Sequence, residues 1–165
     1  MRYQVVALAS EMSGPMTIES VAWQRGTGGS PSGTYNSFRL YMGYCSSDQL
    51  GATFDDNYVP GSRTLVYETP SQTMSADPDQ WMVIPLDTPF EYDGTGNLVL
   101  ELQWTGGVNM FYTYWWETGA GRSVMAGTAD AQTGTVSTSM SELQFSDAAG
   151  LSPSTFGAIK AAFGR

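Results

Sequence analysis

The fold class is decided by one stretch, Asn97-Leu98-Val99-Leu100-Glu101-Leu102-Gln103-Trp104. Leucines occupy every second position and lead to a tryptophan, while valine, glutamate and glutamine fill the positions between them. Because neighbouring side chains of a strand point to opposite faces, this alternation predicts a β-strand with one apolar face. A charged residue between leucines usually faces solvent, so we expect Glu101 on the exposed face.

Two other stretches extend this pattern. Residues 36–44 place Phe38, Leu40 and Met42 on one face and thus predict a second strand of the same kind. Residues 81–86 are more continuously apolar, which predicts a strand in the middle of a sheet. Between residues 81–86 and the leucine strand, residues 90–97 contain two glycines and predict a tight turn.

Segments rich in β-branched and aromatic residues recur along the chain, separated by clusters of Gly, Pro, Asn, Asp and Ser. This spacing, without alternating helices, predicts an all-β fold: a two-sheet antiparallel β-sandwich of jelly-roll type with about nine or ten strands over residues 1–147. The remaining strands are expected at 3–10, 17–25, 64–68, 110–116, 122–127, 134–138 and 142–145.

Residues 148–165 break the β pattern and predict a linker and a short C-terminal amphipathic helix. Ser152 suits the N-cap, Pro153 suits the first helical position, and an apolar stripe follows at Phe156, Ile159 and Phe163. This stripe either covers an edge of its own sandwich or docks on another molecule.

The composition excludes much of the usual catalytic chemistry. The 165 residues include no histidine, one cysteine (Cys45) and one lysine (Lys160), so no Ser-His or Cys-His nucleophile and no histidine metal ligand exists.

A formal net charge of −9 disfavours nucleic acid and anionic membrane surfaces as partners. No stretch is apolar enough to span a membrane. Residues 5–9 are too short for the core of a signal peptide, so an extracellular location implies that a leader has been removed.

Two acidic clusters in loop-like sequence are candidate calcium ligands. They consist of Asp55, Asp56 and Asn57, and of Asp77 and Asp79. Calcium prefers several oxygen ligands of this kind, although neither cluster matches a known calcium-loop spacing. Asp and Asn also favour turns, so a turn without metal is the alternative. No cofactor other than a possible structural Ca²⁺ is expected.

A pair of carboxylates could in principle hydrolyse glycosides, because that reaction needs only an acid and a base or nucleophile. The candidates by residue type are Glu19, Glu101, Glu117 and Glu142. Nothing in their spacing brings two of them together, so we do not expect an enzyme.

An aromatic segment lies between residues 104 and 116. Strand neighbours point to opposite faces, so its rings cannot all enter one core. The rings outside the core either lie under a loop, stack on sugars or meet another subunit. We take as candidate ligand or interface residues Tyr112, Tyr114, Trp115 and Trp116.

The order of short motifs resembles a family of β-sandwich modules in secreted and cell-surface proteins of poorly characterised bacteria. The matching motifs are LASE at 8–11, PSGTYNSFRLYMG at 31–43, FDDNY at 54–58, IPLDTPFEYDGT at 84–95, NLVLE at 97–101 and TGAGR at 118–122. The tail TFGAIKAAF at 155–163 is also similar to short endings of exported proteins of such bacteria. The resemblance implies a secreted or surface-attached module but no particular activity.

Three functions follow as hypotheses. The first is a non-enzymatic extracellular structural or adhesive protein that self-assembles into a filament, sheath or surface layer, or attaches to a surface. The second is a carbohydrate-binding module in which Trp115 or Trp116 stacks on a surface glycan. The third is a viral coat or decoration protein, which shares the fold and the self-assembly.

Overall fold

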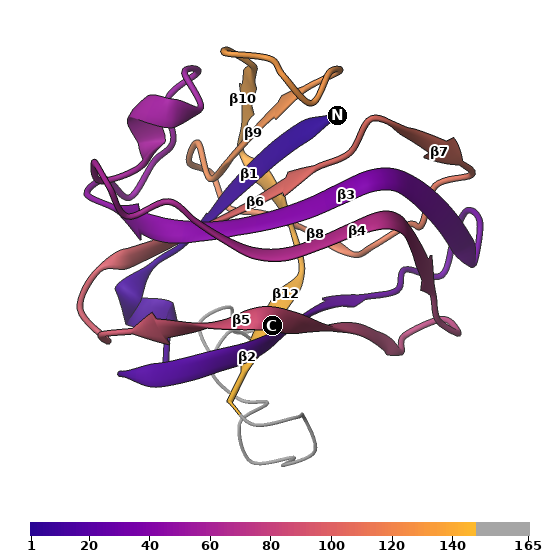
Figure 1. Ribbon diagram of the computed structural model, residues 1–165, viewed down its shortest axis with the longest axis horizontal. Coiled ribbons are helices and arrows are strands. Elements are labelled where there is room, and N and C mark those ends of the chain that lie inside the picture. Colours follow the sequence, from indigo (N-terminus) through magenta and orange to yellow (C-terminus); the bar gives the residue numbers. More distant parts are fainter. Residues whose placement is uncertain (148–165) are drawn as a thin grey trace.

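The computed structural model describes residues 1–147, which form an all-β fold of antiparallel sheets (Figure 1). The large sheet has the strand order β10-β9-β1-β6-β3-β4, and β7 pairs with β3 beside it. Its strands are β10 (Thr135–Ser137), β9 (Ser123–Ala126), β1 (Arg2–Ala7), β6 (Asn97–Gln103), β3 (Ser32–Cys45), β4 (Thr64–Ser75) and β7 (Gly106–Val108).

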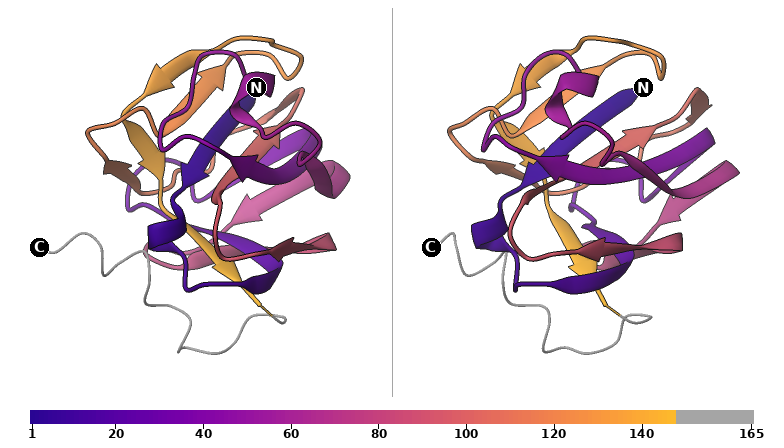
Figure 2. Two further views of the ribbon diagram at one scale, coloured as in Figure 1. Left: turned by 90° about the vertical axis from the view of Figure 1, so that its left-hand side faces the viewer. Right: turned by 60° about the vertical axis from the view of Figure 1, so that its left-hand side comes forward.

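A second sheet lies under the large one, and Figure 2 shows the two layers from the side. It has the order β12-β2-β5, from β12 (Leu143–Ser146), β2 (Met16–Gln24) and β5 (Trp81–Tyr92). A two-stranded sheet pairs β8 (Trp115–Glu117) with β11 (Ser139–Ser141). Two single-turn 3₁₀ helices, η1 (Ala9–Glu11) and η2 (Asp55–Asn57), are the helical elements of residues 1–147, and none of its helices is long and apolar enough to cross a bilayer.

The main core lies between the large sheet and the β12-β2-β5 sheet. Leu98, Leu100 and Leu102 of β6 all point into it, as the alternation in the sequence predicts. The other large contributions come from β3 and from the opposing sheet: Phe38, Leu40, Met42, Ile18, Val21, Trp23, Ile84, Phe90, Leu143 and Phe145. Burial of these side chains is the dominant favourable contribution to folding.

At β1 and β6 the second face of the large sheet is also buried, so the expectation that Glu101 faces solvent is wrong. Glu101 is 0% exposed. The loop between β3 and β4, which carries η2, lies over this face (Figure 1). Phe54 and Tyr58 of this loop pack with Val6 and Val99 of the sheet. The face therefore has its own small core, which also contains Cys45.

The expectation that residues 81–86 form a central strand is also wrong. They belong to β5, which is at the edge of the three-stranded sheet. Pro85 and Pro89 lie within β5, and proline is tolerated at sheet edges because it has no N–H to donate. Val83 is exposed, so one face of β5 meets solvent despite its apolar sequence.

Two further expectations concern the turn and the tail. Gly94 in the turn between β5 and β6 has a φ of 82°, a conformation that glycine adopts without steric cost. The predicted C-terminal helix falls in residues 148–165 and lies outside the described residues.

Candidate functional site

The aromatic segment crosses one end of the sandwich. Backbone hydrogen bonds join it to the end of β2, where the N–H of Tyr114 donates to the carbonyl of Gln24 and the N–H of Gly26 donates to the carbonyl of Tyr112, each at 3.0 Å. An isolated bridge also pairs Arg25 with Thr113. The segment is thus held against the second sheet while its side chains reach toward the large sheet.

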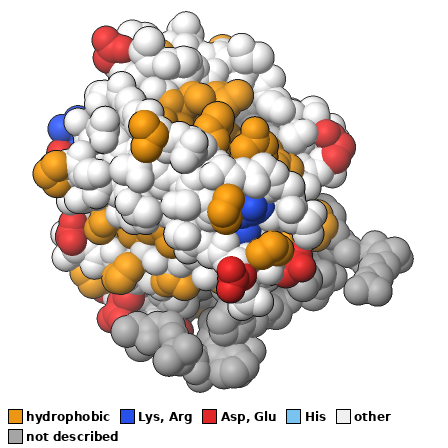
Figure 3. Space-filling model, turned by 90° about the vertical axis from the view of Figure 1, so that its right-hand side faces the viewer, with side chains coloured by type: hydrophobic (Ala, Val, Ile, Leu, Met, Phe, Trp, Pro, Cys, Tyr) orange, Lys and Arg blue, Asp and Glu red, His pale blue; other side chains and the backbone are white. Residues whose placement is uncertain are grey.

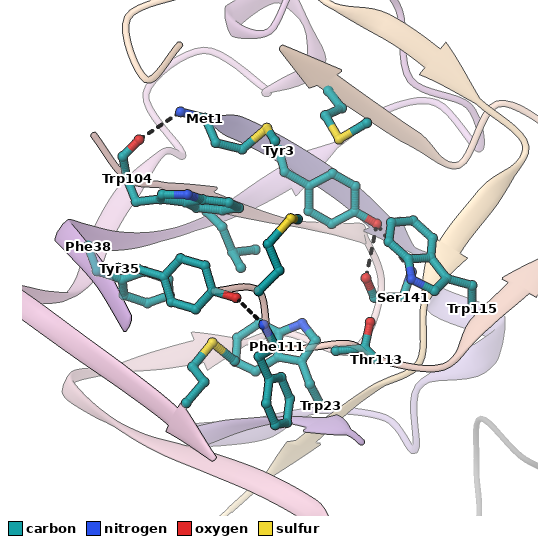
Figure 4. Close-up of a pocket in the computed structure, with 14 residues that line it drawn as sticks. Met1, Tyr3, Trp23, Tyr35, Phe38, Trp104, Phe111, Thr113, Trp115 and Ser141 are labelled. Atoms are coloured by element: carbon teal, nitrogen blue, oxygen red, sulfur yellow. Dashed lines mark hydrogen bonds between the residues drawn. The ribbon is translucent and has the colours of Figure 1, made fainter. Parts of the chain in front are cut away.

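A pocket of about 120 Å³ lies behind this segment, between the layers (Figure 4). Seven aromatic side chains and four methionines make up most of its wall, and they come from strands of the large sheet, from β2, from the N-terminus and from the aromatic segment. The lining residues are Met1, Tyr3, Trp23, Tyr35, Phe38, Met74, Leu102, Trp104, Met110, Phe111, Thr113, Trp115, Met125 and Ser141.

The tyrosine hydroxyls in this pocket are used within the protein. The Tyr35 hydroxyl accepts a hydrogen bond from the Phe111 N–H at 2.8 Å, and the Tyr3 hydroxyl accepts one from the Ser141 N–H at 3.2 Å (Figure 4). Burial raises the pKa of both tyrosines, so each stays neutral at physiological pH. The pocket thus offers chiefly apolar surface to a ligand.

The mouth of the pocket is apolar as well. Met110, Trp115 and Met125 are 55%, 51% and 45% exposed. Figure 3 shows hydrophobic side chains gathered on this face of the molecule. Single exposed apolar residues are common, but a group of them around a pocket is typical of a binding surface.

The structure separates the four aromatic residues singled out from the sequence. Trp115 lines the pocket, where its ring meets the Tyr3 ring edge-on at a centroid distance of 5.9 Å. Tyr112 is exposed and lies so close to Gly29 that a Cβ there would come within 2.2 Å of the ring. Tyr114 donates its hydroxyl hydrogen to the Asp79 carboxylate, and Trp116 packs against the main core. Only Trp115 of these four belongs to the pocket.

The acidic clusters have local partners. The Asp55 carboxylate accepts a hydrogen bond from Arg2 at 2.6 Å, and the Asn57 amide donates to Gln4 at 2.9 Å. Asp79 adopts a positive φ of 65° between β4 and β5, as Asp does more readily than most residues. Within residues 1–147, no group of three acidic, cysteine or histidine side chains lies together. The contacts of Asp55, Asn57 and Asp79 are compatible with the turn interpretation, and the calcium interpretation stays a prediction.

A buried polar cluster surrounds the carboxylate of Glu101, which we name the Glu101 network. Arg2 binds it with both Nε and Nη2 at 3.0 and 3.1 Å, and Arg63 Nη2 donates to Oε1 at 2.7 Å. The remaining donors are the Gln4 amide at 2.6 Å, the Gln103 amide at 2.6 Å and the Tyr58 hydroxyl at 3.2 Å. Sequence reasoning missed this cluster because its members come from distant parts of the chain.

The Glu101 network joins the sheet to the loop that covers it. Burial alone would raise the pKa of the Glu101 carboxyl, but the hydrogen bonds and charges of Arg2 and Arg63 outweigh burial and lower the pKa below its ordinary value. Five side chains occupy the lone pairs of this ionised group. Such a carboxylate holds the fold together and has no position left for a substrate.

Arg25 lies close to the mouth of the pocket and is 2% exposed. It follows the pocket residue Trp23 by two positions, and its Nη2 donates to the carbonyl of Gly29 at 3.2 Å. Within residues 1–147, its Nε and Nη1 have no hydrogen-bond partner. An unsatisfied buried polar group destabilises a fold.

Because comparison with known proteins found no match, the function is inferred from the fold and the site alone. No family model, curated protein or solved structure matches the chain.

Proposed function

We propose that this protein is a non-enzymatic, extracellular structural protein that acts by self-association, and that the pocket receives an apolar side chain of another copy. One observation carries the proposal: a pocket with an apolar wall opens between the half-exposed residues Met110, Trp115 and Met125.

We also propose that the two-layer fold is of the jelly-roll class. The chain passes between the two layers from β1 to β2, back to β3, and again at β5 and β6, as in double Greek keys.

The size of the pocket favours a side chain over a larger ligand. An apolar cavity of about 150 Å³ binds one benzene molecule, so a pocket of about 120 Å³ is of the order of one side chain and not of a larger ligand. A sugar ring is larger and needs several hydrogen-bond partners, whereas the wall of the pocket is mainly apolar and the hydroxyls of Tyr3 and Tyr35 each already accept a backbone N–H. The site thus supports docking of a polypeptide better than glycan binding.

The chemistry of the side chains supports a role without catalysis. The chain contains no histidine, and the most deeply buried carboxylate, Glu101, is bound to two arginines. Exposed aromatic and methionine side chains, in contrast, are the residue types enriched where proteins meet.

Sedimentation velocity of the full chain over a wide concentration range tests the proposal. We expect the sedimentation coefficient to rise with concentration, and we expect Met125→Glu to abolish that rise by placing a charge at the mouth. Val83→Glu is the matched control, since Val83 is similarly exposed (48%) but lies on the edge strand outside the pocket. A wild-type protein that stays monomeric throughout, or equal effects of the two substitutions, would contradict the proposal.

A further inference from the structure

We infer that the group that enters the pocket belongs to residues 155–163 of a second copy, with the ring of Phe156 or Phe163 inside the pocket and the other ring against the apolar side chains at its mouth. This inference rests on the proposed function and names the partner segment. Three observations support it: the charge of the two surfaces, the fit of the side chains, and the direction in which the chain leaves the sandwich.

The charges of the two parts are complementary. Residues 1–147 contain all sixteen acidic residues and five arginines, whereas residues 148–165 contain Lys160 and Arg165 and no acid. In the described part, four arginines are bound in ion pairs: Arg2, Arg39, Arg63 and Arg122. The fifth, Arg25, is buried. The sandwich therefore presents a mainly acidic surface that attracts a basic segment.

The side chains of the segment match the pocket. Phe156, Ile159 and Phe163 recur at three- and four-residue spacing, a sequence pattern typical of an amphipathic docking segment, and each side chain is of the size that the pocket holds. Four methionines line the pocket, and methionine adapts its shape to an inserted ring and contacts aromatic edges favourably.

The chain leaves the sandwich in the direction away from the pocket. Ser141 lines the pocket, and Leu143 of β12 lies opposite the pocket residue Trp23. β12 then runs along β2 until Ser146 lies opposite Ser20, which is about 10 Å beyond Leu143 at 3.3 Å per residue. The described chain thus ends along β2, away from the pocket end of that strand. Docking of this kind is head-to-tail, and repetition without ring closure produces a filament.

Mixing two variants of the full chain tests the inference. One variant carries Phe156→Ala and Phe163→Ala and keeps the pocket, and the other carries Met110→Glu and Met125→Glu and keeps the segment. Each variant alone is expected to remain monomeric, while the equimolar mixture forms a complex that stops at two chains. Each Phe→Ala change alone is expected to weaken association on the order of tenfold to a hundredfold, as loss of one buried aromatic side chain predicts.

The possible outcomes separate this inference from the proposed function. If the double alanine variant associates like the wild type while Met125→Glu does not, the pocket mediates association but the segment is not its occupant. If both variants are monomeric and their mixture stays monomeric, docking in trans is contradicted. A synthetic peptide of residues 152–165 provides a second measurement, because it should bind the double alanine variant, change its tryptophan fluorescence and fail to bind the double glutamate variant. Absence of peptide binding would overturn the inference.

Discussion

The Glu101 network and the apolar pocket lie on the two faces of the large sheet and have opposite chemistry. In the network, a fully buried carboxylate is bound by donors from β1, β6 and the covering loop. In the pocket, apolar walls from both layers end at side chains that are about half exposed.

The difference in chemistry indicates which of the two regions would be stabilised by contact with another molecule. A buried charge whose hydrogen bonds are complete requires nothing from outside, and its loss affects the fold. Exposed apolar surface around a pocket gains free energy when another molecule covers it. The comparison therefore supports a role of the Glu101 network in stability and the proposed role of the pocket in association, and the following predictions test that division.

The largest expected effect is on stability and follows from breaking the Glu101 network. Glu101→Gln leaves the guanidinium of Arg63 without its counter-charge and leaves Arg2 with the exposed carboxylate of Asp55 alone, so the free energy of unfolding should fall by about 3–5 kcal/mol. Glu68→Gln is the matched control, because its ion pair with Arg39 is exposed and contributes at most about 1 kcal/mol. Urea unfolding measures both changes, and equal losses in the two variants would refute the structural role of the network.

The same network should make the protein sensitive to acid. The folded pKa of Glu101 lies below the ordinary value of 4.5, so the unfolded chain binds the proton first as pH falls. The stabilisation by Glu101 is thus complete above about pH 4.5 and is lost progressively below it. Urea unfolding at a series of pH values should show a smaller acid-induced loss in Glu101→Gln than in the wild type. Parallel pH profiles would show that another group controls acid unfolding.

A smaller effect of opposite sign is expected near the mouth of the pocket. Arg25→Met removes the two buried nitrogens that have no partner in residues 1–147 and keeps an apolar side chain of similar length. The free energy of unfolding should rise by about 1–2 kcal/mol, since an unsatisfied buried donor costs about that much. Thermal unfolding checks the direction, and a destabilised variant would indicate that Arg25 makes a favourable interaction.

The smallest effect on stability is expected for a change that removes association. Met110 is mostly exposed, so Met110→Ala should alter the free energy of unfolding by no more than about 0.5 kcal/mol while it weakens self-association. Val108→Ala is a nearby control at an exposed site that does not line the pocket. Light scattering of both variants distinguishes them, and loss of association in the Val108 variant as well would argue against a pocket-specific interface.

The sequence predicts the strands better than it predicts what covers them. The alternation of Leu98, Leu100 and Leu102 identifies β6 and its core face, because that pattern is local. The burial of Glu101 depends on Tyr58 and Arg63, about forty positions earlier in the chain, and no periodicity reveals it. The prolines in β5 indicate an edge strand, but the apolar residues around them favoured the wrong prediction of a central strand.

The pocket was predictable only in part, for the same reason. The density of aromatic residues at 110–116 identifies one wall, including Trp115. Tyr3, Tyr35 and Met74 form other parts of the wall from β1, β3 and β4, and their meeting depends on the topology of the sheets.

Oxidative footprinting of the full chain at low and high concentration tests the central claim most directly. Hydroxyl radicals add oxygen to exposed methionines, and mass spectrometry gives the rate at each one. We predict that oxidation of Met110 and Met125 slows as concentration rises, while Met16, at the opposite end of β2 from the pocket, keeps its rate. Unchanged rates at Met110 and Met125 under conditions where the protein associates would contradict the claim that copies join through this pocket.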